Sequence, residues 1–144
     1  MKVGIILGPG FSVPEAKMYE KLKQHQISPI ALCPASEMQK SKNIDMEVRK
    51  LLLFGQINRV PLLRQIIQYF FPFNFYFIGF NNAVKDLDMI HSVETFNVYT
   101  YQAIRSGKPV VLTIWENILF NNEQRFYKKI KALAIAKTKK FIAI

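Results

Sequence analysis

The sequence predicts a three-layer α/β fold, a Rossmann-like domain built on a mainly parallel sheet. Short apolar runs without polar alternation are typical of strands covered on both faces, and several such runs occur along the chain. Stretches with helical spacing or helix-start residues lie between them, so strand and helix alternate. The chain has 144 residues, of which 50% are hydrophobic, enough for one continuous core. We therefore expect a single domain that spans residues 1–144.

The first strand is expected at residues 3–7, where a short apolar run leads into the sequence GPGFS at residues 8–12, which we call the glycine loop. Ser12 suits an N-cap because its hydroxyl can accept a hydrogen bond from the first turn, where a proline and a glutamate follow. The helix is predicted to run to about residue 25. A strand at 27–33 then completes a right-handed β-α-β unit.

The middle of the chain is less regular. Residues 35–45 are polar and predict a loop, whereas 46–54 and 61–71 carry apolar residues at helical spacing and predict two helices. The aromatic run FFPFNFYFIGF at 70–80 is compatible with a loop, a short strand or a membrane-seeking segment. Periodicity leaves these three alternatives open.

The C-terminal half returns to a regular alternation of strands and helices. Gly107 is expected to end one helix, and the last helix is amphipathic, with Ile130 and Ala134 facing inward and Lys128 facing outward. The elements expected here are a helical turn at 81–86, a strand at 88–93, a helix at 95–106, a strand at 108–115, a helix at 123–137 and a buried strand at 140–144.

Basic residues are in strong excess. Twenty Lys and Arg against ten Asp and Glu give a net charge of +10, so an anionic partner is expected. Nucleic acid, phospholipid headgroups and a phosphorylated substrate all fit this charge. The excess is concentrated in an apolar central region, at Arg49, Lys50, Arg59 and Arg64, and near the C-terminus, at Arg125, Lys128, Lys129, Lys131, Lys137, Lys139 and Lys140.

The apolar segments do not suit a membrane span or a signal peptide. The longest apolar region, 51–80, is interrupted by polar residues and prolines, and the run after Lys2 is too short. We therefore expect a cytoplasmic protein. Cys33 is the only cysteine and has no cluster of metal-ligand residues around it, so we expect a buried structural thiol and no metal site.

In open α/β sheets ligands bind beyond the carboxyl ends of the strands, so the glycine loop is one candidate site. Gly8 and Gly10 allow close backbone approach to an anionic group, and Phe11 and Ser12 complete the loop before a helix N-terminus. The loop matches neither the dinucleotide-binding fingerprint nor the P-loop pattern. A plain tight turn is the alternative.

Two further strand ends carry polar side chains. His91 is expected to end a strand while Glu94 and Thr95 begin a helix, so an imidazole, a carboxylate and a hydroxyl converge there. The alternative is a satisfied structural histidine beside a helix cap. The third position offers a carboxylate and an amide just past a strand, with local backbone hydrogen bonds as the alternative. Its residues are Trp115, Glu116 and Asn117.

Residues 86–120, DLDMIHSVETFNVYTYQAIRSGKPVVLTIWENILF, resemble the N-terminal domain of family 4 glycosyltransferases, which are retaining, metal-independent enzymes with the GT-B fold. In that family a strand ending like Asp-Ile-Ile-His leads through a helix to a "kPvv.T" strand. The opening MKVGIILGPG and the helix PEAKMYEKLK are similar to the family's first strand, glycine loop and first helix. The closing AKTKKFIAI resembles its "ad.fiaiS" strand.

This resemblance implies half of a GT-B enzyme. The N-terminal half of the family holds the sugar acceptor, and a C-terminal half holds the nucleotide-sugar with an E-x₇-E motif, which this chain lacks. The expected function is therefore acceptor binding for sugar transfer, with weak or no activity until a C-terminal domain or a dimer partner completes the cleft. No cofactor is implied beyond the nucleotide-sugar co-substrate. Because many such enzymes use lipid-linked acceptors, the resemblance also implies peripheral contact with an anionic membrane at its inner face.

The resemblance gives site residues only in part. His91 and Glu94 match the first and the acidic positions of the family's H-x-H-E-P motif, and they are the candidate catalytic residues, but Val93 stands where the second histidine belongs. Only a site-lining role is therefore carried over to His91 and Glu94. The alternative function is a non-catalytic, basic Rossmann-type module for nucleic acid or another anionic partner. Nucleic acid is disfavoured because no stacking platform or standard motif is present.

Overall fold

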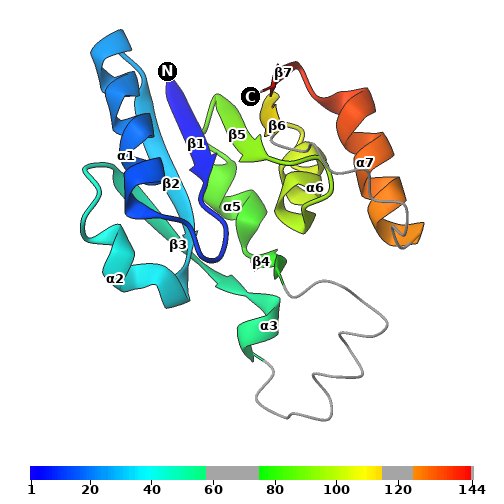
Figure 1. The fold of residues 1–144 in the computed structure, drawn as a ribbon, viewed down its shortest axis with the longest axis horizontal. Coiled ribbons are helices and arrows are strands. Elements are labelled where there is room, and N and C mark those ends of the chain that lie inside the picture. Colours follow the sequence, from blue (N-terminus) through cyan, green and yellow to red (C-terminus); the bar gives the residue numbers. More distant parts are fainter. Residues whose placement is uncertain (58–74, 115–124, 144) are drawn as a thin grey trace.

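The computed structural model describes residues 1–57, 75–114 and 125–143 (Figure 1). Within these ranges seven strands form one sheet in the order β4-β3-β2-β1-β5-β6-β7, and only the β3–β4 pair is antiparallel. The strands are β1 (Lys2–Ile6), β2 (Ser28–Pro34), β3 (Glu47–Leu53), β4 (Phe77–Ile78), β5 (Met89–Val93), β6 (Val110–Ile114) and β7 (Lys140–Ala143). The helices are α1 (Val13–Glu20), η1 (Lys21–His25), η2 (Ala35–Glu37), α2 (Met38–Ser41), α3 (Phe54–Ile57), α5 (Phe80–Val84), α6 (Val98–Arg105) and α7 (Arg125–Lys137).

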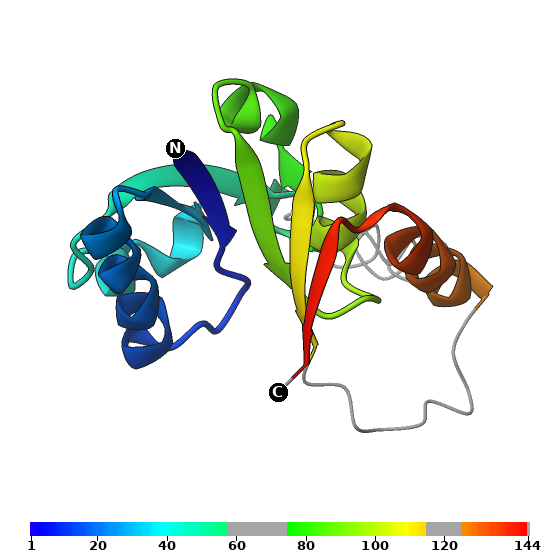
Figure 2. The ribbon, with the colours of Figure 1, turned by 90° about the horizontal axis from the view of Figure 1, so that it is seen from above.

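Helices cover both faces of the sheet, as the three-layer prediction requires. Figure 2 shows α1 and α2 on one face and α5, α6 and α7 on the other. Successive residues of β1 supply both layers, because Ile5 belongs to the core cluster under α1 and Ile6 to the cluster under α5 and α6. Gly4 lies in the middle of this strand, where a Cβ would come within 2.5 Å of Leu87 Cδ1. A larger residue at this position would therefore force the Leu87 side chain to move.

The N-terminal β-α-β unit is as predicted. The Ser12 hydroxyl accepts a hydrogen bond from the Glu15 backbone N–H at 3.3 Å and caps α1. The helix continues as the 3₁₀ turn η1 and ends at Gln26, whose left-handed φ of 58° lets the chain reverse into β2. Cys33 on β2 is fully buried, which confirms the predicted burial of this thiol.

The helix predicted at 46–54 is wrong, because these residues form β3. Leu51 and Leu53 are buried while Leu52 between them is exposed, which is the two-residue period of a strand. A short apolar run satisfies both periodicities, and parallel pairing with β2 decides between them. Pairing also places Arg49 beside Asp86, so this cation is held in an ion pair.

Other boundaries also differ from the sequence-based expectation. The predicted loop at 35–45 contains η2 and α2, and the helix expected to start at residue 95 begins at Val98. The last strand forms, but it is not buried, because Phe141 and Ile142 are 40% and 43% exposed at the edge of the sheet. Part of the aromatic run forms β4 and the start of α5. The helix predicted at 61–71 lies outside the described residues.

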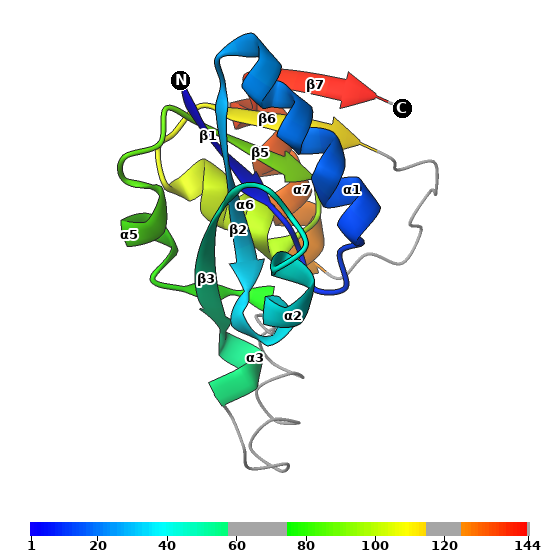
Figure 3. The ribbon, with the colours of Figure 1, turned by 90° about the vertical axis from the view of Figure 1, so that its left-hand side faces the viewer.

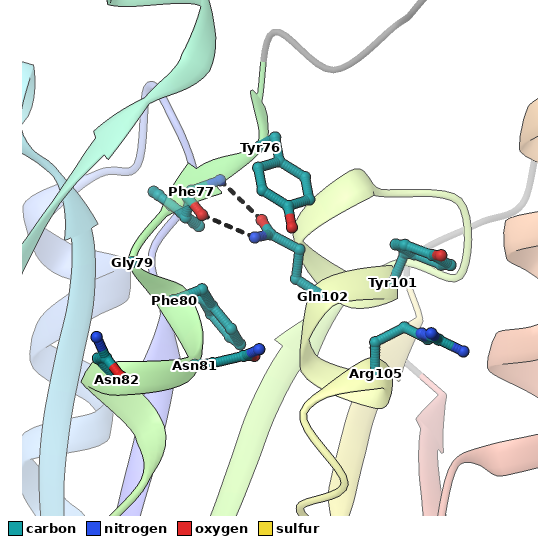
Figure 4. Close-up of a pocket in the computed structure, with 9 residues that line it drawn as sticks. All are labelled: Tyr76, Phe77, Gly79, Phe80, Asn81, Asn82, Tyr101, Gln102 and Arg105. Atoms are coloured by element: carbon teal, nitrogen blue, oxygen red, sulfur yellow. Dashed lines mark hydrogen bonds between the residues drawn. The ribbon is translucent and has the colours of Figure 1, made fainter.

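A single side chain ties β4 to α6. The Phe77 N–H donates to Gln102 Oε1 at 2.7 Å, and Gln102 Nε2 donates to the Phe77 carbonyl at 2.8 Å (Figure 4). Both residues are buried, so these bonds satisfy backbone groups that water does not reach. Gln102 therefore sets where the short edge strand lies against the helix layer.

Candidate functional site

The order of the strands singles out one position at the carboxyl edge of the sheet. The chain leaves β1 for α1 on one face and leaves the neighbouring strand β5 for α6 on the other face (Figure 3). In open α/β sheets such a switch point is where ligands bind. The glycine loop follows β1 and the turn at 94–97 follows β5, so the structure brings two of the three predicted strand ends together.

The glycine loop already binds a carboxylate from its own chain. The Gly10 N–H donates to Glu37 Oε1 at 3.1 Å, and the other Glu37 oxygen pairs with Lys40 at 2.8 Å. The hydrogen bond from Lys40, with that from Gly10, lowers the pKa of Glu37. Lys40 also donates to the Phe11 carbonyl at 3.3 Å. The loop thus stabilises negative charge at Gly10, as expected for exposed backbone N–H groups.

The remaining loop residues have structural roles. Phe11 is buried in the core cluster under α1, and Ser12 caps that helix. Gly8 lies against Tyr99, since a Cβ at this position would come within 3.1 Å of the Tyr99 hydroxyl oxygen. The small size of glycine thus allows the ring of Tyr99, from the first turn of α6, to pack closely against the loop.

His91 lies inside β5 rather than at its end. Its Nε2 is 2.8 Å from Thr113 Oγ1 on β6, and its ring lies 5.1 Å from the ring of Tyr19 on α1. Burial lowers the pKa of His91 to about 4. The imidazole is therefore neutral near pH 7, where it can form hydrogen bonds but is too weak a base for efficient proton abstraction.

The turn after β5 is tightly held. Glu94 adopts a left-handed φ of 62°, and its N–H donates to the Thr113 carbonyl at 2.9 Å. The Thr100 hydroxyl lies 3.1 Å from the Val93 carbonyl and 2.9 Å from the Glu94 carbonyl, which anchors the turn to the first turn of α6. Thr95 is buried and does not cap the helix, since the N-cap position belongs to a later residue of the turn.

Two tyrosines near the switch point could not be identified as candidate site residues from the sequence. Burial, with a smaller contribution from Glu15, raises the pKa of Tyr19 to about 12. The pKa of Tyr99 is raised as well, by burial first and then by Glu94 and Glu15. Both phenols therefore stay protonated at neutral pH and can donate hydrogen bonds. Their helical spacing resembles that of ordinary core residues, so only the fold connects them with His91 and Glu94.

The third predicted position, Trp115 to Asn117, lies outside the described residues. Among the residues that the structure describes, no group of three or more His, Cys, Asp or Glu could hold a metal ion. No helix in the same ranges is both long and apolar enough to cross a bilayer. The groups at the switch point are therefore carboxylates, phenols, one neutral imidazole and backbone N–H groups, which suit hydrogen bonds to a polar, hydroxyl-rich ligand.

A separate cavity of about 400 Å³ lies between α5, β4 and α6 (Figure 4). The buried rings of Phe77 and Phe80 line it together with Asn81 and the Gln102 side chain. None of its lining residues belongs to the glycine loop or to the turn at 94–97, although the ring of Phe77 lies 6.3 Å from that of Tyr99. The switch point and this cavity are therefore different features.

Comparison with solved structures identifies the architecture. The chain is similar to the crystal structure of MurG from Acinetobacter baumannii, with a TM-score of 0.60 and 13% identity over 99% of this chain and 40% of that chain. It is also similar to CalG4, the calicheamicin glycosyltransferase, with a TM-score of 0.56 and 14% identity over 91% of this chain and 36% of that chain. The fold is that of one half of a GT-B glycosyltransferase.

A third solved glycosyltransferase structure is also similar to this chain. The spinosyn rhamnosyltransferase SpnG, solved with thymidine diphosphate, matches this GT-B half with a TM-score of 0.53 and 9% identity over 99% of this chain and 44% of that chain. The chain thus spans less than half the length of each of these proteins. No protein-family model and no curated protein matches the sequence. The predicted Rossmann-like half of a GT-B fold is confirmed, and the assignment to family 4 stays a prediction.

Proposed function

We propose that this GT-B half is the N-terminal, acceptor-binding domain of a family 4 glycosyltransferase. The observation that carries the proposal is the alignment of nearly the whole chain with under half of three glycosyltransferases. The order of the sequence motifs, from the first strand to the last, supports the N-terminal half. In this proposal a second domain, from the same polypeptide or from a dimer partner, binds the nucleotide-sugar.

The switch point is the proposed acceptor site. Tyr19 and Tyr99 supply phenol donors, and Glu94 supplies a carboxylate near Tyr99. His91 Nδ1 makes no hydrogen bond to any residue that the structure describes, but it is buried, so His91 supports the site from inside the sheet rather than contacting the acceptor. Its low pKa keeps the imidazole neutral, so it does not act as the base. Stabilisation of the departing nucleotide diphosphate falls to the other half, so this chain alone should transfer little or no sugar.

Amide NMR titration of the isolated chain tests this assignment. Soluble hexoses and N-acetylhexosamine disaccharides are expected to shift the amide signals of Gly8, Gly10, Glu94 and Thr95, whereas UDP and dTDP leave them unchanged. A Glu94→Gln variant should weaken the sugar response. Glu47→Gln, at the opposite edge of the sheet, is the matched control and should retain it.

The opposite ranking of ligands would overturn the proposal. A nucleotide diphosphate that shifts the switch-point amides while the sugars do not would identify the donor-binding half of a GT-B enzyme instead. Absence of any sugar response, or sugar transfer at full rate by these 144 residues alone, would also contradict it.

A lipid-linked acceptor fits the surface near this site. Leu52, Phe54, Phe75, Tyr76 and Ile78 are exposed, and Leu52 pairs directly with Ile78 across the β3–β4 ladder. We call these five residues the apolar rim. It lies at the carboxyl edge of β3, the same edge as the switch point (Figure 1). We therefore propose peripheral contact with an anionic membrane on its cytoplasmic face.

Vesicle co-sedimentation tests this contact. A Leu52→Gln/Ile78→Gln variant is expected to bind phosphatidylglycerol vesicles several-fold more weakly than the wild type, because apolar area is lost from the rim. Met18→Gln/Ile135→Gln is the matched control, since both of its residues are exposed on other elements. Equal binding by the two variants would exclude the apolar rim as the membrane contact.

A further inference from the structure

A second cavity, of about 390 Å³, lies at the amino edge of the sheet, where α6 and α7 end and β6 and β7 begin. We call it the basic cavity. Ile104 and Leu133 contribute apolar surface, no acidic side chain lines it, and its cationic lining residues are Arg105, Lys108, Lys137 and Lys139. Its volume is in the range of small-ligand sites, roughly 300–1,000 Å³.

These cations lack acidic partners. Lys108 Nζ is fixed by hydrogen bonds of 2.7 Å to the carbonyls of Lys85 and Leu87. Within the described part of the chain, the side chains of Arg105, Lys137 and Lys139 form no hydrogen bond or ion pair. Arg105 extends from α6 away from Phe80 (Figure 4). Several positive charges thus surround one space without compensation.

The surroundings of the basic cavity do not supply the missing negative charge. Every charged residue in the stretches 105–114 and 125–143 is Lys or Arg. Asp86 and Asp88 lie at the same edge of the sheet, but Asp86 binds Arg49 and Lys2, and Asp88 accepts a hydrogen bond from the Lys2 backbone N–H at 2.7 Å. These carboxylates are therefore engaged elsewhere.

Helix dipoles offset only part of the positive charge that lines the basic cavity. The C-termini of α6 and α7 both lie at the basic cavity, and each carries a partial negative charge of about one half. Together they offset about one of the four lining charges. The Gly107 and Thr138 N–H groups also bond to the Ile104 and Ala134 carbonyls near those helix ends, which reduces the need for side-chain donors. A net positive cavity remains.

We propose that the basic cavity binds the phosphate or diphosphate group of a small soluble ligand, such as a sugar phosphate. The planar fork of Arg105 matches two phosphate oxygens, and Lys137 and Lys139 add point charges from the facing element. A soluble source is favoured over a lipid headgroup because the apolar rim lies at the opposite edge of the sheet, so a membrane held there faces away from this cavity. This site is independent of the proposed acceptor site and shares no residue with it.

Isothermal titration with pyrophosphate and glucose 1-phosphate, at fixed ionic strength, tests the proposal on the full chain. Lys137→Ala/Lys139→Ala is expected to weaken binding about tenfold or more, because two charge-assisted contacts are lost. Lys128→Ala/Lys129→Ala is the matched control, since it removes the same charge from an exposed part of α7 outside the cavity. The control should change the affinity less than about twofold, and Arg105→Gln should behave like the cavity variant.

Each remaining outcome contradicts the proposal. No binding of either probe by the wild type, or equal weakening by both lysine pairs, would mean diffuse surface charge and no site. Phosphatidylglycerol vesicle binding lost only in the cavity pair, with no response to the soluble probes, would assign the cavity to a lipid headgroup. Urea unfolding of each variant verifies that the fold persists. Sugar binding at the switch point is measured separately, so failure of one assignment leaves the other intact.

Discussion

Replacing Gln102 with leucine is expected to lower the free energy of unfolding by about 2–6 kcal/mol, since each of the two buried backbone groups left without a partner costs about 1–3 kcal/mol. Leucine nearly preserves the volume but removes both hydrogen bonds to Phe77. The edge strand β4 would then lose its tie to α6. Urea denaturation followed by circular dichroism measures the difference.

Two companion variants separate hydrogen bonding from burial. Gln102→Glu keeps the acceptor for the Phe77 N–H, and when the acid is protonated its O–H can donate to the Phe77 carbonyl, so we expect a smaller loss than for leucine at the pH at which the acid is protonated. Gln24→Leu, on the exposed surface of η1, controls for the change from amide to alkyl and should shift stability by about 0.5 kcal/mol or less. A Gln102→Leu protein as stable as this control would show that Phe77 finds other partners.

Acidification is expected to destabilise the fold through His91, whose pKa is lowered by burial from 6.5 to about 4. Between these two values the unfolded chain binds more protons than the folded chain, so stability falls as the pH falls. From pH 7 to pH 5 the contribution of this one group is about 2 kcal/mol. The stabilisation is fully present above pH 6.5 and is lost progressively towards pH 4.

Urea unfolding at pH 7 and pH 5 measures this contribution when the wild type is compared with His91→Gln. The glutamine does not titrate, and its amide can still bond to Thr113. Carboxylates contribute to the pH dependence of both proteins, so the difference between the two slopes isolates the imidazole. Identical slopes would show that His91 is accessible to protons in the folded state.

The local elements were predictable from the sequence, and their partners were not. The cap at Ser12 needs only its own first turn, and the strand at residues 2–6 needs only a short apolar run before a glycine. The strand at 47–53 was assigned as a helix because its apolar residues fit both periods. Pairing with β2, which lies far back in the sequence, resolves the ambiguity.

The residues of the candidate site were likewise only partly predictable from the sequence. His91 and Glu94 could be selected by their position after an apolar run, but the sequence placed His91 at the end of the strand, whereas hydrogen bonding to Thr113 holds it inside the sheet. Tyr19 and Tyr99 could not be selected, because an aromatic residue on the buried face of a helix is typical of any core. Only the packing of α1 and α6 on β1 and β5 brings Tyr19 against the ring of His91 and Tyr99 against Gly8 of the glycine loop.

By itself the sequence determined the alternation of strands and helices, the glycine loop with its capped helix, and the strongly basic C-terminal region. These features depend on residues that are near one another in the chain, where periodicity, capping and composition act directly. The tertiary structure alone decided the strand order, and with it the switch point at β1 and β5, the tie between Gln102 and Phe77, and the cavity that gathers Arg105 with Lys137 and Lys139. Each joins segments far apart in sequence, and such contacts follow from how the layers pack rather than from any local pattern.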